Sequence, residues 1–201
     1  MAPRDGRCKV NMKDISLIGF MGCGKSSVGK ILATLLPECR LIDLDTYIEE
    51  KQGKNIPEIF NEYGEAAFRR MEREALEEIF SDKSRPRAIL SLGGGTVTSE
   101  QCRQLIRQHT DCFYLRATTD TLLDNLEGHS DGRPMLNPTQ PVEAQSTETS
   151  SEREALRRRI ESLMQTRSPQ YLATANHIID IDGLSFAQIA EAVEDNILNI
   201  K

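Results

Sequence analysis

The chain has 201 residues, of which 38% are hydrophobic, and a formal net charge of −6. This length suits one α/β domain with a buried core, and the negative charge argues against nucleic acid or an anionic membrane as the main partner. No stretch is apolar for long enough to span a membrane. The five cysteines lack metal-type spacing, which predicts reduced thiols and a cytoplasmic location.

Residues 1–12 are basic but lack the apolar segment of a secretion signal, so we expect a disordered leader. Met12 is a candidate alternative start. Residues 13–201 are expected to form a single domain, because no internal repeat is visible.

A glycine-rich loop follows the first expected strand, residues 14–19. The loop, residues 19–26, reads GFMGCGKS and fits the pattern G-x-x-x-x-G-K-[S/T]. Behind it, apolar residues recur on one face of an expected helix: Val28, Ile31, Leu32, Leu35 and Leu36. A strand, a glycine-rich loop and a helix in this order are the context that a phosphate-binding loop requires.

The chemistry of this loop suits the phosphates of a nucleoside triphosphate. Glycines let backbone N–H groups converge on phosphate oxygens, and the helix start adds donors and a positive dipole end. Lys25 can reach the β- and γ-phosphates, and the Ser26 hydroxyl can bind Mg²⁺. The alternative is a glycine-rich turn without a ligand. The expected nucleotide-binding residues are Gly22, Cys23, Gly24, Lys25, Ser26 and Ser27.

Cys23 lies inside this loop, and a helix N-terminus can lower the pKa of a thiol. Ordinary packing within the loop is favoured over redox control as the interpretation of this residue.

Two carboxylates end the second expected strand, residues 40–45. Asp43 and Asp45 are two positions apart, so in a strand they point to the same face. Ligands bind at the carboxyl ends of the strands in open parallel sheets, which favours a functional pair. The alternative is a helix N-cap formed by Asp45 ahead of Thr46.

Residues 46–81 are expected to be helical, with breaks near Gly53 and Pro57. One face is apolar and contains Phe68, Met71, Ala75, Leu76 and Ile79. Arg69, Arg70 and Glu72 lie off that face. Taken alone, arginines among glutamates indicate a solvated surface with i,i+3 and i,i+4 pairs.

Three consecutive glycines, residues 93–95, follow the third expected strand, residues 87–92. Each glycine loses extra backbone entropy on folding, so close approach of a ligand explains them better than a plain turn. The next helix is expected to begin with a capping box of Thr98 and Gln101. The apolar stripe of this helix makes His109 a core-edge residue rather than a ligand.

The pattern weakens after the fourth expected strand, residues 111–117. Residues 137–151 are rich in Pro, Gln, Ser, Thr and Glu and are expected to be mobile. A helix follows, with these residues facing inward: Leu156, Ile160, Leu163 and Met164. Its arginine run, residues 157–159, is interpreted as solvated surface.

The fifth expected strand is residues 177–181, and a last helix begins at a capping box of Ser185 and Gln188. The residues of this helix that are expected to face inward are Phe186, Ile189, Val193 and Ile197.

An ordered set of motifs resembles the shikimate kinases. These motifs are the phosphate-binding loop, the D-x-D strand end, the F-R pair at residues 68–69, the triple glycine, R-P-M-L at 133–136 and R-x-x-x-Y at 167–171. The resemblance spans residues 14–198. It implies an α/β, three-layer P-loop kinase fold with a parallel five-stranded sheet of order 2-3-1-4-5 flanked by helices. It also implies a substrate-binding helical segment at residues 46–80 and a lid with a polar insertion at residues 120–151.

The resemblance implies a kinase of the shikimate pathway that transfers the γ-phosphate of ATP to the 3-hydroxyl of shikimate. At the phosphate end, Ser26 and Asp43 would be associated with Mg²⁺, while Lys25 and Arg133, the lid arginine, would contact the nucleotide. Lys25, Asp45 and Arg133 are then the expected catalytic residues.

At the substrate end, the resemblance places Asp45 against the shikimate hydroxyls and both Arg69 and Arg167 on the carboxylate. Glu72 would hold Arg69 in place. The floor between substrate and γ-phosphate would be lined by Gly94 and Gly95.

Two features depart from the family pattern. Residues 120–132 contain no Lys or Arg, although many shikimate kinases have a basic residue there that stacks on adenine. The stretch between Arg133 and Arg167 is also longer than usual, because of the polar residues 137–151.

Two other functions are compatible with part of the pattern. A kinase for another small polyol, such as gluconate, would not be expected to share the F-R and R-x-x-x-Y motifs. A non-catalytic nucleotide-binding domain would be expected to lack Lys25, Asp45 or Arg133. We expect a monomer that binds ATP and shikimate and has neither a nucleic-acid nor a membrane partner.

Overall fold

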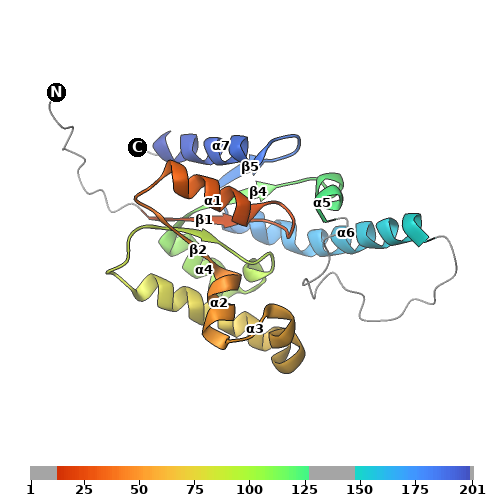
Figure 1. Cartoon of the computed structure of the whole chain (residues 1–201), viewed down its shortest axis with the longest axis horizontal. Helices are drawn as coiled ribbons and strands as arrows, with labels where there is room; N and C mark the ends of the chain where they lie inside the picture. Colours follow the sequence, from red (N-terminus) through yellow and green to blue (C-terminus); the bar gives the residue numbers. More distant parts are fainter. Residues whose placement is uncertain (1–12, 127–147, 200–201) are drawn as a thin grey trace.

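A five-stranded parallel sheet lies between two layers of helices in the computed structural model, which describes residues 13–126 and 148–199 (Figure 1). The strand order is β2-β3-β1-β4-β5, so the expected fold class and the order 2-3-1-4-5 are confirmed. The strands are β1 Asp14–Ile18, β2 Arg40–Asp43, β3 Ala88–Ser91, β4 Thr110–Arg116 and β5 His177–Asp180.

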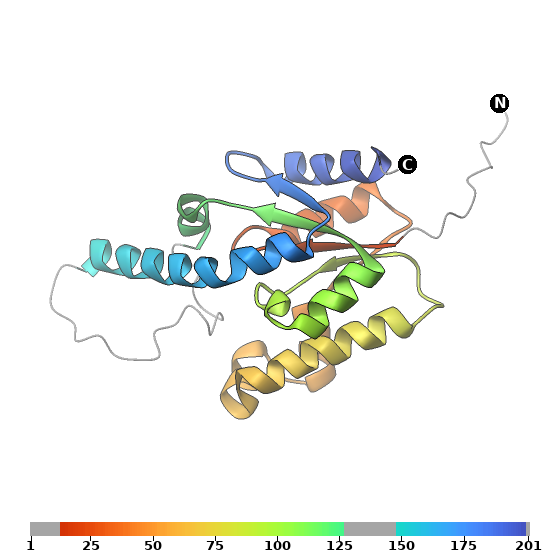
Figure 2. The ribbon, with the colours of Figure 1, turned by 180° about the vertical axis from the view of Figure 1, so that it is seen from behind.

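Helices α1 and α7 cover one face of the sheet, and α3 and α4 cover the other (Figure 1). Helix α6 runs beside α4 and β4 at its C-terminal end and projects past the sheet toward α5 at the other (Figure 2). The helices are α1 Lys25–Leu35, α2 Leu44–Gln52, α3 Ile56–Ser81, α4 Glu100–His109, α5 Thr119–Leu126, α6 Glu148–Thr174 and α7 Phe186–Asn199, with a 3₁₀ turn, η1, at Thr96–Thr98. No helix in the described ranges is long and apolar enough to cross a lipid bilayer.

Alternation of side chains along the central strands builds both halves of the core. In β4, Phe113 and Leu115 pack in the cluster under α1 and α7, whereas Cys112 and Tyr114 pack in the cluster under α3 and α4. All four are essentially inaccessible to solvent. A strand that is buried on both faces needs apolar residues at odd and even positions alike. This is why the strands read as continuous apolar runs.

The D-x-D carboxylates do not both lie in a strand. Strand β2 ends at Asp43, whose side chain accepts from the Thr46 backbone N–H at 3.3 Å and caps α2. Asp45 therefore lies in the first turn of α2, so the expectation of a strand through residue 45 was wrong, as was the alternative of Asp45 as the cap. Because an N-cap residue keeps extended geometry, a strand can pass directly into a helix at this position.

The expected break near Gly53 and Pro57 is confirmed, because α2 ends at Gln52 with Gly53 as its C-cap and Pro57 lies in the first turn of α3, where no N–H is needed. Other helix boundaries differ from the expected ones, and α3 has a further interruption at Gly64. Helix α4 is capped by Ser99, not by Thr98, whose hydroxyl donates to the Gly95 carbonyl. Helix α6 continues through Pro169 to Thr174.

Other corrections concern helices α5, α1 and α7. Helix α5 occupies a stretch for which the weakened pattern gave no secondary-structure prediction. Leu35 and Phe186, both expected to face inward, are exposed at 36% and 42%. The Ser185–Gln188 capping box is confirmed, with the Gln188 N–H donating to the Ser185 hydroxyl and the Ser185 N–H to the Gln188 side chain.

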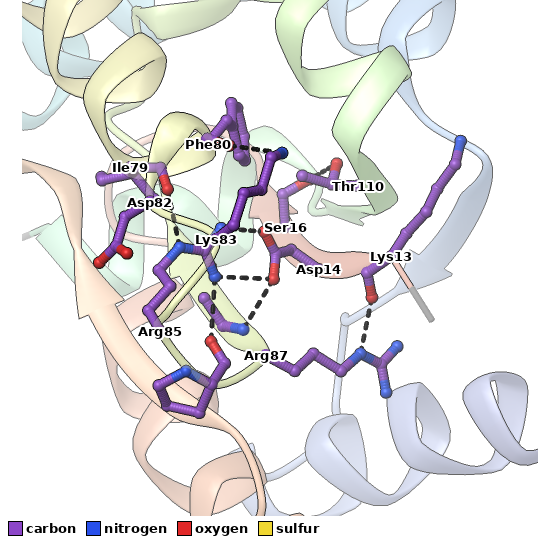
Figure 3. A network of polar contacts seen from close by, with 12 residues as sticks. Lys13, Asp14, Ser16, Ile79, Phe80, Asp82, Lys83, Arg85, Arg87 and Thr110 are labelled. Atoms are coloured by element: carbon purple, nitrogen blue, oxygen red, sulfur yellow. Dashed lines mark hydrogen bonds and ion pairs between the residues drawn. The ribbon is translucent and has the colours of Figure 1, made fainter. Parts of the chain in front are cut away.

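The parallel arrangement brings the C-termini of helices to the edge of the sheet where the strands begin, and cations satisfy carbonyls there (Figure 3). Lys83 donates to the carbonyl of Phe80 and Arg85 to that of Ile79, both in the last turn of α3. Lys13 donates to the carbonyl of Arg107 near the end of α4.

Arg85 also joins the end of α3 to the start of β1. Its guanidinium forms a two-pronged ion pair with Asp14, whose Oδ1 additionally accepts from the Ala88 N–H at 2.8 Å (Figure 3). The two side chains are only 13% and 11% exposed. The pair fixes the register of β1 against β3 far from the carboxyl ends of the strands.

We predict that Arg85→Ala lowers the free energy of unfolding by about 2–3 kcal/mol, because it leaves Asp14 largely buried without its partner. The melting temperature should fall by roughly 5–10 °C, measured by calorimetry. Arg73→Ala, which breaks the more exposed pair of Arg73 with Glu77, is the matched control and should change little. Equal effects of the two variants would show that the Asp14–Arg85 pair contributes no more to stability than an exposed ion pair.

Candidate active site

The loop between β1 and α1 needs glycine for its backbone and for its packing. Gly22 and Gly24 have φ values of 84° and 85°. A Cβ atom at Gly24 would lie 2.5 Å from a ring carbon of Phe186, and one at Gly22 would lie 2.8 Å from Cγ of Leu126. Both positive φ angles and close packing therefore restrict these positions to glycine.

The Lys25 side chain lies inside the curve of this loop. Its ammonium group donates to the carbonyl oxygens of Gly19 and Phe20, both at 2.9 Å, and lies 3.7 Å from Sγ of Cys23. Only 8% of Lys25 is exposed. The loop therefore holds one positive charge next to the unpaired N–H groups that begin α1, an arrangement that attracts anions.

Cys23 is completely buried and its thiol is free. It lies beneath the loop rather than on its open side, and a Cβ atom at Gly19 would come within 2.8 Å of its sulfur. This position fits the packing interpretation.

Ser26, Asp43 and Ser91 bring three side-chain oxygen groups together at the start of α1 and the ends of β2 and β3. The Ser26 hydroxyl donates to Oδ2 of Asp43 at 2.6 Å, and the hydroxyls of Ser26 and Ser91 are 3.2 Å apart. Hard oxygen donors beside a phosphate-binding loop suit Mg²⁺, which takes one or two carboxylates and completes its shell with phosphates and water. No cluster of three or more His, Cys, Asp or Glu residues that could hold a metal occurs within 13–126 and 148–199.

Asp45 is a carboxylate of strongly perturbed acidity at this edge of the sheet. Burial, together with the negative charges of Glu72 and Asp43, raises its pKa from 3.8 to about 7, although Lys25 opposes this shift. A carboxylate with a pKa near neutrality can accept a proton at physiological pH.

Glu72 is fully buried between the triple glycine and Arg69. Its Oε2 accepts from Nη1 of Arg69 at 2.6 Å, and its Oε1 accepts from the Thr96 hydroxyl. Arg69 also pairs with Glu65 at 3.1 Å. The predicted hold of Glu72 on Arg69 is thus present in the geometry.

Arg167 is a buried cation that forms no ion pair with the described part of the chain. It is 3% exposed, donates to the Gly94 carbonyl at 3.4 Å and lies 5.8 Å from the centre of the Phe20 ring. Burial lowers its pKa, and the neighbouring Arg69 adds to this effect. The Tyr171 hydroxyl donates to the same Gly94 carbonyl.

The missing side chains of Gly93, Gly94 and Gly95 make room mainly for other atoms of the protein. A Cβ atom at Gly93 would lie 2.9 Å from Oε1 of Glu72 and 3.0 Å from Oδ1 of Asp45, and one at Gly95 would overlap the Arg69 guanidinium. A Cβ atom at Gly94 would lie 3.1 Å from the backbone N of Met21. The glycines are therefore required for contacts within the protein, in addition to any approach of a ligand.

A cavity of about 360 Å³ opens over the loop. The expected site residues that line it are Gly22, Gly24, Lys25, Ser26, Ser27, Asp43, Asp45 and Gly94. Three other expected residues lie next to the floor of this cavity: Arg167 donates to the Gly94 carbonyl, and Gly95 packs against Arg69. Arg133 falls outside the described residues, as do residues 1–12 and most of the predicted lid.

A family model described as shikimate kinase matches residues 21–197. The chain belongs to the shikimate kinase family. Its members are ATP-dependent kinases, so the chain is an ATP-dependent phosphotransferase of the shikimate pathway.

Individual shikimate kinases are similar over most of their length. The shikimate kinase of Sulfurihydrogenibium sp. (strain YO3AOP1) is 36% identical over 182 residues, which covers 90% of this chain and 96% of that protein. The one of Chlorobaculum tepidum is 37% identical over 187 residues, with 91% of each covered. The structure of the shikimate kinase from Acinetobacter baumannii in complex with shikimate has a TM-score of 0.77 and 29% identity, covering 94% of this chain and 96% of that one.

Four residues of this shikimate kinase site were not expected from the sequence. Ser91 and Thr96 bond to Ser26 and Glu72, Asn125 donates to the Gly22 carbonyl at 2.9 Å, and Phe186 lines the cavity. Ser91 did carry a signal, since it is the single polar residue of the buried strand Ala88–Ser91. Asn125 carried none, because its helix was not predicted.

A second cavity of about 400 Å³ adjoins the first, since Asn125 and Phe186 line both. It lies between α5 and the turn that leads from β5 into α7. Its other lining residues are Thr121, Asp124, Ile181, Gly183, Leu184, Ser185 and Ile189.

We predict that Asp45→Asn stabilises the ligand-free protein, measured with a chelator present, and that the gain grows with pH. With a native pKa of about 7, Asp45 keeps its proton to a higher pH than it would in the unfolded chain, so native stability falls as pH rises between about 4 and 7. The amide removes this loss, which we put at about 1–2 kcal/mol at pH 8 because Asp45 is partly exposed.

The melting temperature of Asp45→Asn should therefore exceed that of the parent protein by roughly 3–6 °C at pH 8 and by much less at pH 5. Glu50→Gln, which alters an exposed carboxylate on the same helix, is the control and should have a small effect at both pH values. A gain that is the same at pH 5 and pH 8 would contradict the raised pKa.

Proposed function

We propose that the first cavity transfers the γ-phosphoryl group of ATP to the 3-hydroxyl of shikimate, which yields shikimate 3-phosphate and ADP. The observation that carries this proposal is the buried Arg167, a cation without a carboxylate partner in the described ranges, at the floor of a phosphate-binding cavity. A buried charge without a partner is costly, and the carboxylate of shikimate would supply that partner.

The loop binds the nucleotide phosphates. Lys25, Ser26 and Ser27, which begin α1, line this cavity, and Lys25 holds its ammonium group against the loop. Gly22, Gly24, Ser26 and Ser27 line it, while Cys23 supports the loop from below. Phosphoryl transfer depends chiefly on positioning and charge neutralisation, and this arrangement supplies both.

Mg²⁺ would be held by the oxygens of Ser26 and Asp43, a donor set that matches its preference. When bound, the ion would neutralise charge on the transferring phosphate.

Asp45 orients the attacking hydroxyl and accepts its proton. It lines the cavity beside Lys25, and its pKa of about 7 leaves a useful fraction of both protonation states near neutral pH. The negative charges of Glu72 and Asp43 that raise this pKa also strengthen Asp45 as a base.

Arg69 and Arg167 clamp the shikimate carboxylate from two elements of the fold. Glu72 holds Arg69 from within α3, and the Gly94 carbonyl holds Arg167 from the glycine turn. Two forked guanidinium groups can bind one carboxylate with several charge-assisted hydrogen bonds.

The second cavity takes the nucleobase. It continues the phosphate cavity past Asn125 and Phe186, and the exposed Phe186 ring offers a flat apolar surface there. Aromatic rings stack on bases without a hydrogen-bonding code. This stacking would provide a contact to the nucleobase, which the chain otherwise lacks because residues 120–132 contain no Lys or Arg.

Arg133 remains our proposed lid arginine, and the lid at residues 120–151 remains part of the proposal. A monomer in the cytoplasm is the proposed form and place of the protein. The reduced state of the four described cysteines, all free and buried, supports a reducing compartment.

The decisive experiment measures binding of shikimate and of an analogue whose carboxylate is replaced by an alcohol. Arg167→Ala should weaken shikimate binding about 10- to 150-fold, because it removes hydrogen bonds worth about 1.5–3 kcal/mol. Arg167→Lys should also weaken it, since the fork is lost. The alcohol analogue should bind the parent and Arg167→Ala almost equally.

Arg70→Ala is the matched control for Arg69→Ala, because Arg70 is exposed and donates to the Ala66 carbonyl of its own helix. It should leave shikimate binding unchanged while Arg69→Ala weakens it. If both Arg69→Ala and Arg167→Ala bind shikimate like the parent, the carboxylate lies elsewhere or the substrate is a different hydroxy acid.

We predict that Phe186→Ala raises KM for ATP about tenfold with little effect on KM for shikimate, because it removes the stacking surface. Phe186→Leu, which keeps an apolar contact with Gly24, should raise KM for ATP almost as much. Tyr63→Ala alters another exposed aromatic residue, on α3, and serves as the control. A Phe186→Leu enzyme with the parent KM for ATP would show that the ring does not stack on the base.

A further inference from the structure

We propose that Glu65 occupies the place of the substrate carboxylate on Arg69 in the free enzyme and is displaced when the substrate binds. This inference rests on the proposed function, because that function assigns the substrate carboxylate to Arg69 and Arg167. It adds a residue that sets the affinity for the substrate by competing with it for the same guanidinium group.

The Arg69 guanidinium of the free site is already paired at both of its terminal nitrogens. Nη1 donates to Glu72 at 2.6 Å, and Nη2 donates to Glu65 at 3.1 Å. A two-pronged contact with a carboxylate uses Nη1 together with Nη2, or Nε together with one of them. A substrate carboxylate that binds in this way therefore meets a nitrogen that already has an anionic partner.

Of the two partners, Glu65 is the one that can leave. Glu72 is fully buried and also accepts from the Thr96 hydroxyl, so its release from Arg69 would strand a buried charge. The Glu65 side chain is 48% exposed, and in the described part of the chain its one hydrogen bond comes from Arg69. Water can replace this bond, because exposed ion pairs are held only weakly.

The chain leaves room for Glu65 to turn away. Gly64 departs from helical geometry, with φ 76° and ψ 170°, so Glu65 begins the second segment of α3. The spacing of four residues brings its side chain next to Arg69 on the helix surface. A Cβ atom at Gly64 would meet no atom of residues 13–126 or 148–199 within 4 Å. The start of this segment is therefore open to solvent on the side of the break.

The charge of Glu65 also acts on the second arginine of the clamp. Burial lowers the pKa of Arg167, and the negative charge of Glu65 is among the influences that oppose this shift. One exposed carboxylate therefore acts on both guanidinium groups that the substrate carboxylate would contact.

A purely supporting role for Glu65 predicts the opposite effect on binding. If Glu65 only held Arg69 in the geometry that binds substrate, its removal would weaken binding. If Glu65 competes with the substrate, the free enzyme has an ion pair that binding must break, and removal of that pair strengthens binding. The direction of the change therefore separates the two roles.

The experiment measures the dissociation constants of shikimate and of the alcohol analogue that lacks the carboxylate, by titration calorimetry. Glu65→Gln should bind shikimate about two- to fivefold more tightly than the parent, which corresponds to the loss of one exposed ion pair. The alcohol analogue should bind both proteins almost equally, because it carries no charge that replaces Glu65 on Arg69. Unchanged or weaker binding of shikimate by Glu65→Gln would overturn the inference.

Glu77→Gln is the matched control. Glu77 lies on the same helix, is 45% exposed and pairs at 3.0 Å with Arg73, which is also four residues away. This variant should bind shikimate like the parent. An equal gain in Glu77→Gln would contradict the inference, since the loss of any negative charge on α3 would then suffice.

The Arg69→Ala background tests the route of the effect. Glu65→Gln should gain little shikimate affinity there, because the pair that it removes is already absent. A gain as large as in the parent would mean that Glu65 repels the ligand through space without competing for Arg69, contrary to the inference.

Arg69→Ala alone separates this inference from the proposed function. If Arg69→Ala weakens shikimate binding and Glu65→Gln does not strengthen it, the role of Glu65 is wrong and the proposed clamp stands. If Arg69→Ala binds shikimate like the parent, the proposed contact of Arg69 with the carboxylate is wrong, and the role of Glu65 is overturned with it.

Discussion

The shared direction of the five strands is the constraint on which the structure depends. Because every strand is parallel, the helices that follow the strands begin at one edge of the sheet and end at the other. The edge with helix C-termini collects unpaired carbonyls, which Lys13, Lys83 and Arg85 satisfy. The opposite edge keeps unpaired N–H groups at the start of α1. Anions are therefore favoured at one edge only, and the phosphate-binding loop lies there.

The active edge concentrates charges that a structure built only for stability would avoid. Glu72 is fully buried, and its negative charge acts in opposite ways on two neighbouring residues. It pairs with Arg69, which orients that cation, and it repels the charge of Asp45, which raises the pKa of that carboxyl. Arg167 is buried with only carbonyl and ring contacts. A bound carboxylate would supply the partner that the Arg167 cation lacks, so part of the ligand affinity would come from the unfavourable burial of this charge in the free site.

Local sequence patterns predicted the strands, the loop and most core faces, because period-2 and period-3.6 patterns depend on nearby residues only. They failed where a competing local bond or a distant contact decides the outcome. Asp45 looked like a strand residue until the bond from Thr46 to Asp43 ended β2 early. Phe186 has the spacing of a core residue, yet it packs on Gly24 at the rim of two cavities. Nothing near Ser91 in the chain reveals Ser26, because the two meet through the pairing of β1, which leads into the loop, with β3.

The glycine turn after β3 shows why the site is difficult to alter one residue at a time. Gly93 separates Asp45 from Glu72, Gly94 accepts hydrogen bonds from Arg167 and Tyr171, and Gly95 packs against the guanidinium of Arg69. Each glycine therefore sets the distance between a charged side chain and the floor of the cavity. Adding a single methyl group at Gly95 would move Arg69 away from Glu72, and the movement would alter the field at Asp45 through Glu72. The carboxylate clamp and the proposed base are thus coupled through one turn, although the residues come from three different elements of the fold.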